Sequence, residues 1–507
     1  MHADMALLGG SGSLMTAHSD LERAFHPKSV AIVGVPRSEA NHPPGYTGYT
    51  FLRLLQQARF EGHIYPVNPN ASVIADLKAY PSVIAIPEPL DLVIVAVPLA
   101  AVPRVLEDCV AAGVVNVQIA TAGFSETGEA AGREMEAKVR EIALRGGLRV
   151  VGPNCLGYHV PSARMQMYDK IVLAQGPVAF LSQSRGHGQG YVRIGPSFGI
   201  GFSKVISYGN AVMMDCTDFL EYLATDPETR IICMYLEGVR DGRRLVELVR
   251  QIDSHKPIVV WKGGLTASGA RAAATHTGSL AGDGQIWDAF FKQTGAIQVG
   301  SIEEMADVSM TLLQLKPSPG ARLAVLGGGG GNNVATADIC AEEGLGLPAP
   351  SAETRARLLE FMTLINQSVV NPLDAGSVFA STALLLRALE ALAADPLVDI
   401  IVLHMGADYA KWFSPQALAE LKSCIVDFNN KGPTGKPVVA AIHEQEKPAE
   451  AAEFVLDLRQ AGITTYSSLR RACRALRRFA GYHRFVAESR ADQIRNICKI
   501  ANDTETM

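Results

Sequence analysis

The fold class is decided by the stretch SVAIVGV, which occupies positions 29–35. Its residues are mostly apolar and rich in β-branched valine and isoleucine, and Gly34 opens the loop PRS at positions 36–38. A helix is predicted to follow at 49–58. A continuous apolar run, a glycine-containing turn and then a helix are typical of a parallel α/β sheet, because helices bury such a strand on both faces.

The same pattern recurs along the chain and predicts three α/β units. The predicted strands lie at 29–35, 63–67, 91–97, 115–120 and 148–151 in the first unit, at 178–181, 203–207, 231–236 and 258–261 in the second, and at 322–326, 400–404 and 438–441 in the third. We place these units at 20–150, 151–315 and 321–485. The first is Rossmann-like, and the other two resemble each other in strand–helix order.

The segments outside these units are predicted to be tails and a linker. The linker KPSPG at 316–320 separates the second and third units, because its prolines and glycine cannot continue a helix. Residues 1–19 are expected to form a flexible tail. A basic helix is expected at 467–489, and residues 486–507 are expected to form a C-terminal tail.

Composition narrows the class of protein. The chain has 507 residues, of which 48% are hydrophobic and 19% charged, which is typical of a globular protein of about three domains. The net charge of -5 argues against nucleic-acid binding. The eight cysteines form no CxxC pair, so we expect no metal site. No apolar run reaches the roughly 18–20 residues that a membrane-spanning helix needs, and we expect a cytoplasmic protein.

Four loops of the first unit are candidates for binding a ligand. They begin at Gly34, Asn68, Val97 and Ala122, and each follows a predicted strand. The carboxyl ends of parallel strands meet at one edge of a sheet, where open α/β sheets bind their ligands. The alternative is that the glycines and prolines of these loops only form turns.

A histidine in the second unit is a candidate nucleophile. His276 lies in the segment RAAATHTGSLAG at 271–282, where small residues leave its ring uncrowded. An imidazole attacks phosphorus when one ring nitrogen is free and the other is held, usually by a carboxylate. Glu237 closes a predicted strand and is the candidate holder. A structural histidine and a surface glutamate are the alternatives.

The loop SQS at 182–184 lies at the end of another strand and precedes a predicted helix. Free N–H groups and hydroxyls at a helix N-terminus can hold a phosphoryl group, aided by the helix dipole. The alternative is that Ser184 simply caps the helix. Lys262 either neutralises phosphate charge or lies on the surface.

Taken together, these motifs resemble those of a known family, the NDP-forming acyl-CoA synthetases, which are related to succinyl-CoA synthetase. The resemblance is to their CoA-binding, or alpha, part and covers about 20–485. It rests on PKSVAIVG at 27–34, YPVNP at 65–69, GPNCLG at 152–157, GFSK at 201–204, YLEG at 235–238, the His276 segment and NPLD at 371–374. It implies a Rossmann-like CoA-binding domain followed by two flavodoxin-like domains.

The resemblance also implies a reaction. ATP phosphorylates His276, which Glu237 orients; the phosphoryl group passes to an acid as an acyl phosphate; and CoA then displaces phosphate. The implied phosphate-binding residues are Ser182, Gln183, Ser184, Arg185, Thr277 and Gly278. The implied CoA-binding residues are Gly34, Pro36, Arg37, Ser38, Asn68, Pro69, Val97, Pro98, Ala122, Gly123, Asn154 and Cys155.

Two departures from the family pattern concern the phosphate site and a glycine loop. The family usually has a glycine and a small residue after the second serine of SQS, but this chain has Arg185-Gly186-His187. Arg185 adds positive charge at the phosphate or fills its site, and His187 could carry a second proton. The five glycines at 327–331 differ from the family's usual loop, so docking there is expected to differ.

No ATP-grasp module or P-loop is recognisable in the sequence. The resemblance therefore implies a separate ATP-grasp beta subunit that binds ATP/ADP and Mg²⁺, in an alpha2beta2 assembly. Two other functions stay open at this point. One is a CoA-binding regulatory or scaffold protein without phosphoryl transfer, and the other is an ATP-independent CoA transferase.

Overall fold

The computed structural model describes residues 11–38, 47–266, 268–269, 283–318, 320–327, 330–363, 367–406, 414–431, 435–443 and 448–505. The chain divides into two compact units. One comprises Met1–Pro196 with Gly201–Ile302, and the other comprises Ser197–Ile200 with Glu303–Met507. No helix among the described residues is long and apolar enough to cross a membrane.

The first sheet is a doubly wound parallel sheet, as predicted. Its order is β2-β1-β5-β6-β7, so the chain reverses its direction of winding between β1 and β5. The strands are β1 (Ser29–Val33), β2 (His63–Val67), β5 (Leu92–Val95), β6 (Asn116–Ile119) and β7 (Arg149–Val151), and the main helices are α2 (Gly48–Gln57), α3 (Val102–Ala111) and α4 (Ala130–Gly146). All five residues of β1 are buried, which explains its apolar run. A short hairpin, β3 (Val73–Ile74) with β4 (Leu77–Lys78), was not predicted.

The second sheet lies in the same compact unit, and its order is β13-β12-β11-β9-β10-β8. Its strands are β8 (Gly157–His159), β9 (Gln175–Ser182), β10 (Phe202–Ser207), β11 (Ile231–Leu236), β12 (Ile258–Lys262) and β13 (Ile297–Val299). Its helices are α5 (Arg185–Ile194), α6 (Cys216–Thr225), α7 (Gly242–Ile252) and α9 (Gly284–Thr294). The edge strand β8 runs antiparallel to β10, and β8 and β13 were not predicted.

The third sheet belongs to the second compact unit, and its order is β15-β14-β16-β17-β18. Its strands are β14 (Leu323–Gly327), β15 (Leu373–Asp374), β16 (Ile400–Gly406), β17 (Val438–His443) and β18 (Thr465–Tyr466). Its helices include α11 (Gly330–Glu342), α12 (Ala352–Leu359), α13 (Thr382–Ala394), α15 (Pro415–Lys431) and α16 (Pro448–Gln460). In chain order these strands repeat the 2-1-3-4-5 arrangement of the second sheet's parallel strands. The predicted resemblance between these two units is therefore confirmed.

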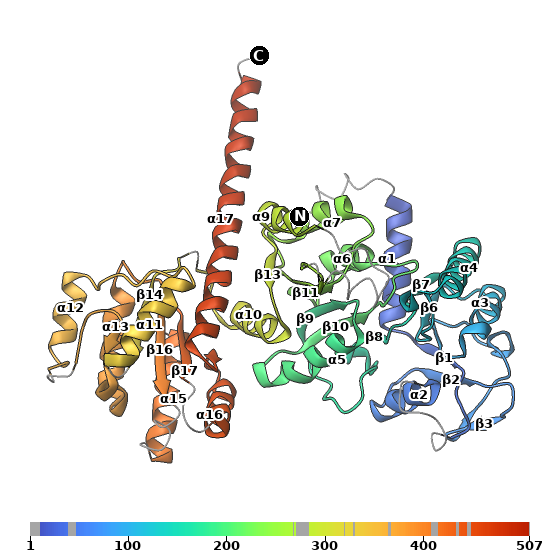
Figure 1. Cartoon of the computed structure of the whole chain (residues 1–507), viewed down its shortest axis with the longest axis horizontal. Helices are drawn as coiled ribbons and strands as arrows, with labels where there is room; N and C mark the ends of the chain where they lie inside the picture. Colours follow the sequence, from blue (N-terminus) through green and yellow to red (C-terminus); the bar gives the residue numbers. More distant parts are fainter. Residues whose placement is uncertain are drawn as a thin grey trace. The chain divides into compact units, whose positions relative to one another are not determined.

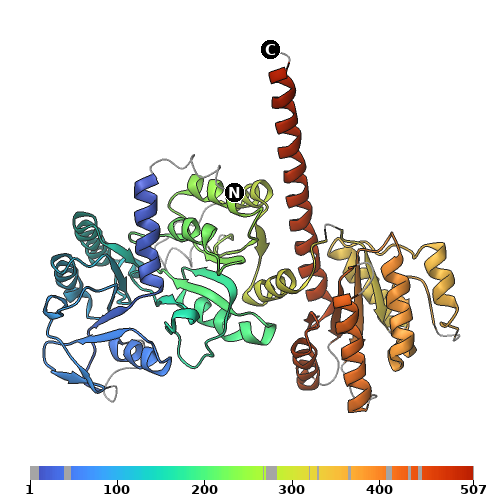
Figure 2. The same ribbon diagram turned by 180° about the vertical axis from the view of Figure 1, so that it is seen from behind.

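Both predicted tails are wrong in part, because helices occupy residues that were expected to form them. Helix α1 (Ser11–Phe25) begins within the expected flexible tail, and Leu21 and Phe25 on it are buried. At the other end, α17 (Leu469–Glu505) continues well past the predicted end at 489, and both views show it as one uninterrupted helix (Figures 1 and 2).

Helix α10 (Ile302–Gln314) joins the second compact unit, although the sequence placed it before the linker at the end of the second domain. Arg471 on α17 donates from Nε to Asp307 Oδ2 at 2.7 Å, and Arg478 donates to Glu304 Oε1 at 2.6 Å. Asp307 is buried, so this ion pair fixes α10 against α17. Its partners are distant in sequence, and a local pattern could not reveal them.

A buried lysine holds the second sheet together beside α1. Lys204 on β10 donates from Nζ to Asp226 Oδ2 at 2.9 Å and to Glu228 Oε2 at 2.8 Å. The rings of Phe25 and Tyr222 lie 5.9 and 5.7 Å from this ammonium group. An ammonium group buried in this way depends on its carboxylate partners, because water cannot replace them.

Replacing Lys204 by methionine should therefore destabilise the fold. The change leaves the buried Asp226 without its cation, which costs about 3 kcal/mol in comparable buried pairs. Urea unfolding followed by circular dichroism measures the loss of free energy of unfolding. The matched control is Lys138→Met on α4, where the lysine is exposed and the same change should have little effect. Equal stability of the two variants would contradict this role for Lys204.

Candidate functional site

The four predicted ligand loops lie side by side at one edge of the first sheet, because β2, β1, β5 and β6 are neighbours and parallel. Gly34 has a φ of +92°, and a Cβ there would lie 2.4 Å from the carbonyl oxygen of Ala96. Its N–H donates to the carbonyl of Val67 at 3.1 Å. Only glycine fits this turn. The absence of a side chain lets the chain turn at the end of β1 while β1 stays packed between β2 and β5.

Side chains brace the first two loops. Asn68 donates from Nδ2 to the carbonyl of Val35 at 2.8 Å and accepts the N–H of Asn70 at 2.8 Å. Arg37 donates to the carbonyl of Asn70. Pro36 is half-buried, and Arg37, Ser38 and Pro69 are exposed. The loops therefore present a braced, open edge at which a ligand can contact both backbone and side chains.

The next two loops are braced in the same way. Thr121 donates from Oγ1 to the carbonyl of Val97 at 2.7 Å, and Gly123 donates its N–H to Glu126 Oε1 at 2.6 Å. Pro98 and Ala122 are exposed at this edge. All four predicted loops thus meet at a single edge of the sheet.

A polar network joins these loops to the second sheet. Asn210, in the turn after β10, donates from Nδ2 to Glu126 Oε2 at 2.6 Å and to Glu136 Oε2 at 2.9 Å. Its Oδ1 lies 3.4 Å from Nδ2 of Asn154. Because Glu126 also holds Gly123, Asn210 positions the loop at the end of β6. Neither Asn210 nor Glu126 was predicted from the sequence, since the hydrogen bonds of Asn210 join segments far apart in the chain.

Asn154 and Cys155 differ in what they offer a ligand. Asn154 has a φ of +59° and donates its N–H to the carbonyl of Thr121 at 3.0 Å, so it lies at the edge where the two sheets meet. Cys155 is buried and donates from Sγ to the carbonyl of Ile119 at 3.4 Å. Burial raises the pKa of its thiol to about 12. The thiol of Cys155 is therefore buried and hydrogen-bonded within the fold, and it does not face a ligand.

The predicted phosphate-binding loop ends β9 and begins α5. Ser184 caps α5, because its Oγ accepts the N–H of His187 at 3.4 Å. Ser182 donates from Oγ to the carbonyl of Ser184 at 2.7 Å. Gln183 makes a contact that was not predicted: its Oε1 accepts the backbone N–H groups of Glu237 and, at 2.9 Å, of Gly238. It ties the ends of β9 and β11 together.

The two residues that depart from the family pattern have different environments. Arg185 is the first residue of α5 and is exposed. His187 is half-buried, and its ring lies 4.3 Å from the ring of Tyr235 and 4.5 Å from that of Trp261. The exposed Arg185 therefore adds positive charge at the N-terminus of α5 and is not buried in the fold.

Glu237 lies directly after β11 and is 4% exposed, which corrects the alternative of a surface glutamate. Tyr235 donates its hydroxyl to Glu237 Oε1 at 3.1 Å, and Lys262 donates from Nζ to the carbonyl of Glu237 at 2.9 Å. Burial lowers the pKa of Lys262 to about 8, while the charge of Glu237 acts in the opposite direction. Lys262 is 3% exposed, so its predicted surface alternative is also wrong.

His276, Thr277 and Gly278 lie outside the described residues. Their segment connects β12, which ends at Lys262, with α9, which begins at Gly284. Glu237 follows β11, the strand paired with β12. The strand that precedes the His276 segment thus pairs with the strand that precedes Glu237.

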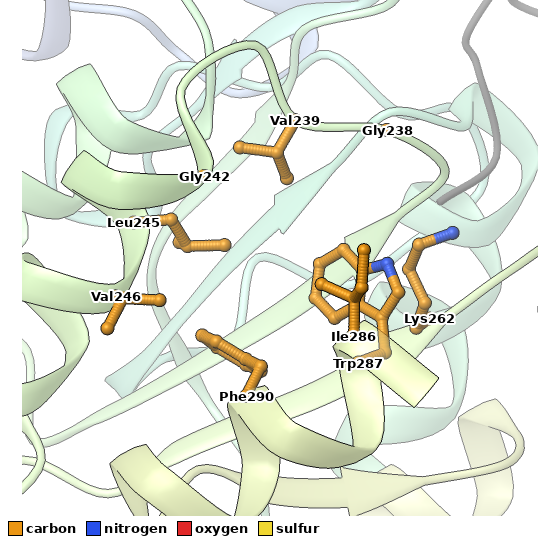
Figure 3. Close-up of a pocket in the computed structure, with 9 residues that line it drawn as sticks. All are labelled: Gly238, Val239, Gly242, Leu245, Val246, Lys262, Ile286, Trp287 and Phe290. Carbon is orange, nitrogen blue, oxygen red and sulfur yellow. The ribbon is translucent and has the colours of Figure 1, made fainter. Parts of the chain in front are cut away.

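A pocket of about 180 Å³ lies next to Glu237, because the following residue, Gly238, lines it. It is lined by Gly238 and Val239, by α7, by α9 and by Lys262, and Figure 3 shows the apolar side chains of the two helices facing it. The sequence analysis did not find this pocket. The apolar spacing of Ile286, Trp287 and Phe290 on one helix was the available signal, but it does not distinguish a pocket from a core.

Comparison with known proteins gives two domain matches. A CoA binding domain matches residues 28–161, and a succinyl-CoA ligase like flavodoxin domain matches residues 175–312. The alpha subunit of ADP-forming acetate–CoA ligase II from Pyrococcus furiosus is 37% identical over 452 residues, which are 88% of this chain and 94% of that protein. The chain belongs to the family of NDP-forming acyl-CoA synthetases.

Two further members of the family extend the comparison. The ADP-forming acetate–CoA ligase I of Archaeoglobus fulgidus is 35% identical over 475 residues; these are 93% of this chain but 65% of that longer protein. The solved dinucleotide forming acetyl-coenzyme A synthetase 1 of Candidatus Korarchaeum cryptofilum, in complex with phosphate and ADP, has a TM-score of 0.79 at 32% identity. The match covers 92% of this chain and 98% of that one. The predicted resemblance and fold class are confirmed.

Within this NDP-forming acyl-CoA synthetase, replacing Asn210 by aspartate should weaken CoA binding about tenfold. The new carboxylate would face Glu126 and Glu136, and like charges at this distance repel, so the loop at Gly123 would lose its support. Isothermal titration of CoA into the full chain measures the change. The matched control is Asn430→Asp, an exposed position on α15. Unchanged CoA affinity in Asn210→Asp would show that Asn210 does not position this loop.

Proposed function

We propose that the chain is the CoA-binding, phosphoryl-carrying subunit of an acid–CoA ligase that forms ADP or another NDP, with His276 as the carrier. One observation carries this proposal most strongly: Glu237 is a buried carboxylate at the end of β11, and β11 pairs with β12, the strand after which the His276 segment follows in the chain. Gln183 ties the backbone of Glu237 to the start of α5. A histidine carrier needs such a carboxylate to hold one ring nitrogen while the other reacts.

The reaction has three reversible steps. In the first, N–P bond formation at His276 breaks the bond between the γ-phosphoryl group and the NDP. In the second, a carboxylate oxygen of the acid attacks phosphorus, and the N–P bond breaks to release the imidazole with an acyl phosphate. In the third, the CoA thiolate attacks the acyl carbon, and inorganic phosphate leaves.

Residues of the chain support each step. Glu237 holds the imidazole in the tautomer that attacks phosphorus. The N-terminus of α5 and the exposed Arg185 stabilise the negative phosphoryl group, because the helix dipole and the guanidinium both favour an anion there. The four loops at the edge of the first sheet hold CoA, which comes to the chain as a substrate. In this arrangement Cys155 contributes only its backbone.

The nucleotide and Mg²⁺ belong, in this proposal, to an ATP-grasp beta subunit in an alpha2beta2 assembly. Two observations support this assignment. The relatives from Pyrococcus furiosus are named as alpha subunits, and the curated relative from Archaeoglobus fulgidus is a longer chain of which this one spans 65%.

The reverse reaction tests the proposal without a nucleotide. Acetyl-CoA and ³²P-labelled phosphate should form acetyl phosphate and then label the chain on histidine. The label should be lost in acid, persist in alkali and map by mass spectrometry to residues 271–282. The chain is assayed alone and with its partner subunit. CoA binding without label would favour the scaffold function, and CoA exchange between acids without phosphate would favour the transferase. Either result would overturn the proposal.

A further inference from the structure

We infer that the pocket beside Glu237 is the acyl pocket of this enzyme, and that it takes a carboxylic acid with an apolar tail of several carbon atoms in preference to acetate. This inference rests on the proposed function and adds a substrate class to it. The pocket volume of about 180 Å³ is smaller than that of most drug-sized sites, roughly 300–1,000 Å³, so the pocket suits an acid of modest size.

The lining of the pocket fits a hydrocarbon tail. Leu245 and Val246 come from α7, and Ile286, Trp287 and Phe290 come from α9; all five face the pocket in Figure 3. Ile286 is 67% exposed, so it lies at the open side of the pocket. Among the nine lining residues, only Lys262 and Trp287 carry a polar side-chain atom.

Lys262 gives the pocket a single charged end. It is 3% exposed, it lies beside Trp287 in Figure 3, and its Nζ is 5.2 Å from the centre of the Trp287 ring. The ammonium group has three protons. Two go to the carbonyls of Glu237 and Gly263, and no acceptor among the described residues takes the third. Both of these hydrogen bonds go to neutral carbonyls, so the third proton is available for an anion, and a carboxylate supplies one.

The position of Lys262 connects the pocket to the reaction. Its ammonium contacts the backbone of Glu237, and Gly238, the next residue, also lines the pocket. A carboxylate bound at Lys262 with its tail between α7 and α9 therefore lies beside the residue that we assign to orient His276. Each methylene group that leaves water for such a pocket raises affinity roughly fourfold, so an acid with four or five buried carbon atoms should be preferred to acetate about 10²-fold.

Acid preference tests this inference in the full chain assayed with its partner subunit. The kcat/KM values for acetate, butanoate and 3-phenylpropanoate are compared in the wild type and in Gly242→Leu. Gly242 lines the pocket, and a Cβ added there meets nothing within 4 Å, so a larger side chain can be introduced at this wall of the pocket. We expect the ratio of 3-phenylpropanoate to acetate to be about 10² in the wild type and to fall at least tenfold in the variant.

The matched control is Gly481→Leu, an exposed glycine on α17 with equally open surroundings. It should leave the ratio unchanged. An equal loss for all acids in Gly242→Leu would show that the pocket binds a partner or supports the fold, and would overturn the inference.

Direct binding gives a readout that does not depend on turnover. Titrating 3-phenylpropanoate should change the fluorescence of Trp287, so the signal should disappear in Trp287→Phe, and Lys262→Met should weaken binding at least tenfold. No fluorescence change together with normal activity on acetate would overturn the acyl pocket and leave the proposed function standing. Binding of 3-phenylpropanoate without phosphohistidine in the reverse reaction would instead count against the proposed function alone.

Discussion

Replacing His276 by alanine should abolish phosphorylation of the chain and reduce acyl-CoA formation by more than about 10³-fold, since without the carrier nitrogen the phosphoryl group has no route to the acid. The measurement is the ³²P label formed from acetyl-CoA and phosphate, together with CoA ester formation in the presence of the partner subunit. CoA affinity, measured by titration, should be unchanged because the CoA loops lie on a different sheet.

His187 provides the matched control, because it lies in the first turn of α5, at the proposed phosphate site. Its ring packs between Tyr235 and Trp261, and its backbone N–H is bonded to Ser184. His187→Ala should therefore keep the acid-labile label. A label that survives in His276→Ala and disappears in His187→Ala would move the carrier role to α5 and refute our assignment.

The second large effect is expected at Glu237. Glu237→Gln keeps the size of the side chain and an oxygen for the hydroxyl of Tyr235, but it removes the charge that holds the imidazole. The rate of phosphohistidine formation should fall by about 10³-fold, by analogy with other carboxylate–histidine pairs. Rapid quench of the ³²P reaction measures this rate, and the final amount of label should change less than the rate does.

Tyr235→Phe separates the charge of Glu237 from its hydrogen bond. It removes only the hydroxyl donated to Glu237 Oε1, so the rate should fall by less than about tenfold. A wild-type rate in Glu237→Gln would mean that another group orients His276. Equal losses in the two variants would mean that the position of Glu237, rather than its charge, is what matters.

The strands and loops were predictable because their determinants are local. The strand predicted at 231–236 matches β11, and the four ligand loops lie at one sheet edge because parallel strands place them there. A run of buried β-branched residues followed by glycine or proline is readable without knowing its neighbours. The predicted loop at Ser184 was correctly placed for the same reason.

What the sequence did not reveal depends on distant partners. The burial of Lys262 follows from the packing of α9 over β12, and the role of Gln183 follows from the register between β9 and β11. The hydrogen-bond partners of Asn210 lie 74 and 84 residues away. Helix α1 was missed because glycines precede it, and the contacts that stabilise it come from residues far along the chain.

Helix α1 also determines how this protein can be recombined with its relatives. Its His18 bonds to Thr225 at 2.9 Å on the second sheet's α6, while Arg23 forms an ion pair with Asp91 at 2.9 Å on the first sheet. The CoA-binding segment at 28–161 is thus not a self-contained cassette. A chimaera that exchanges this segment should therefore include α1. The recipient should also have residues equivalent to Thr225 and Asn210, because these hold α1 and the loop at the end of β6. Without them, we expect the transplanted loops to lose their position relative to the second sheet.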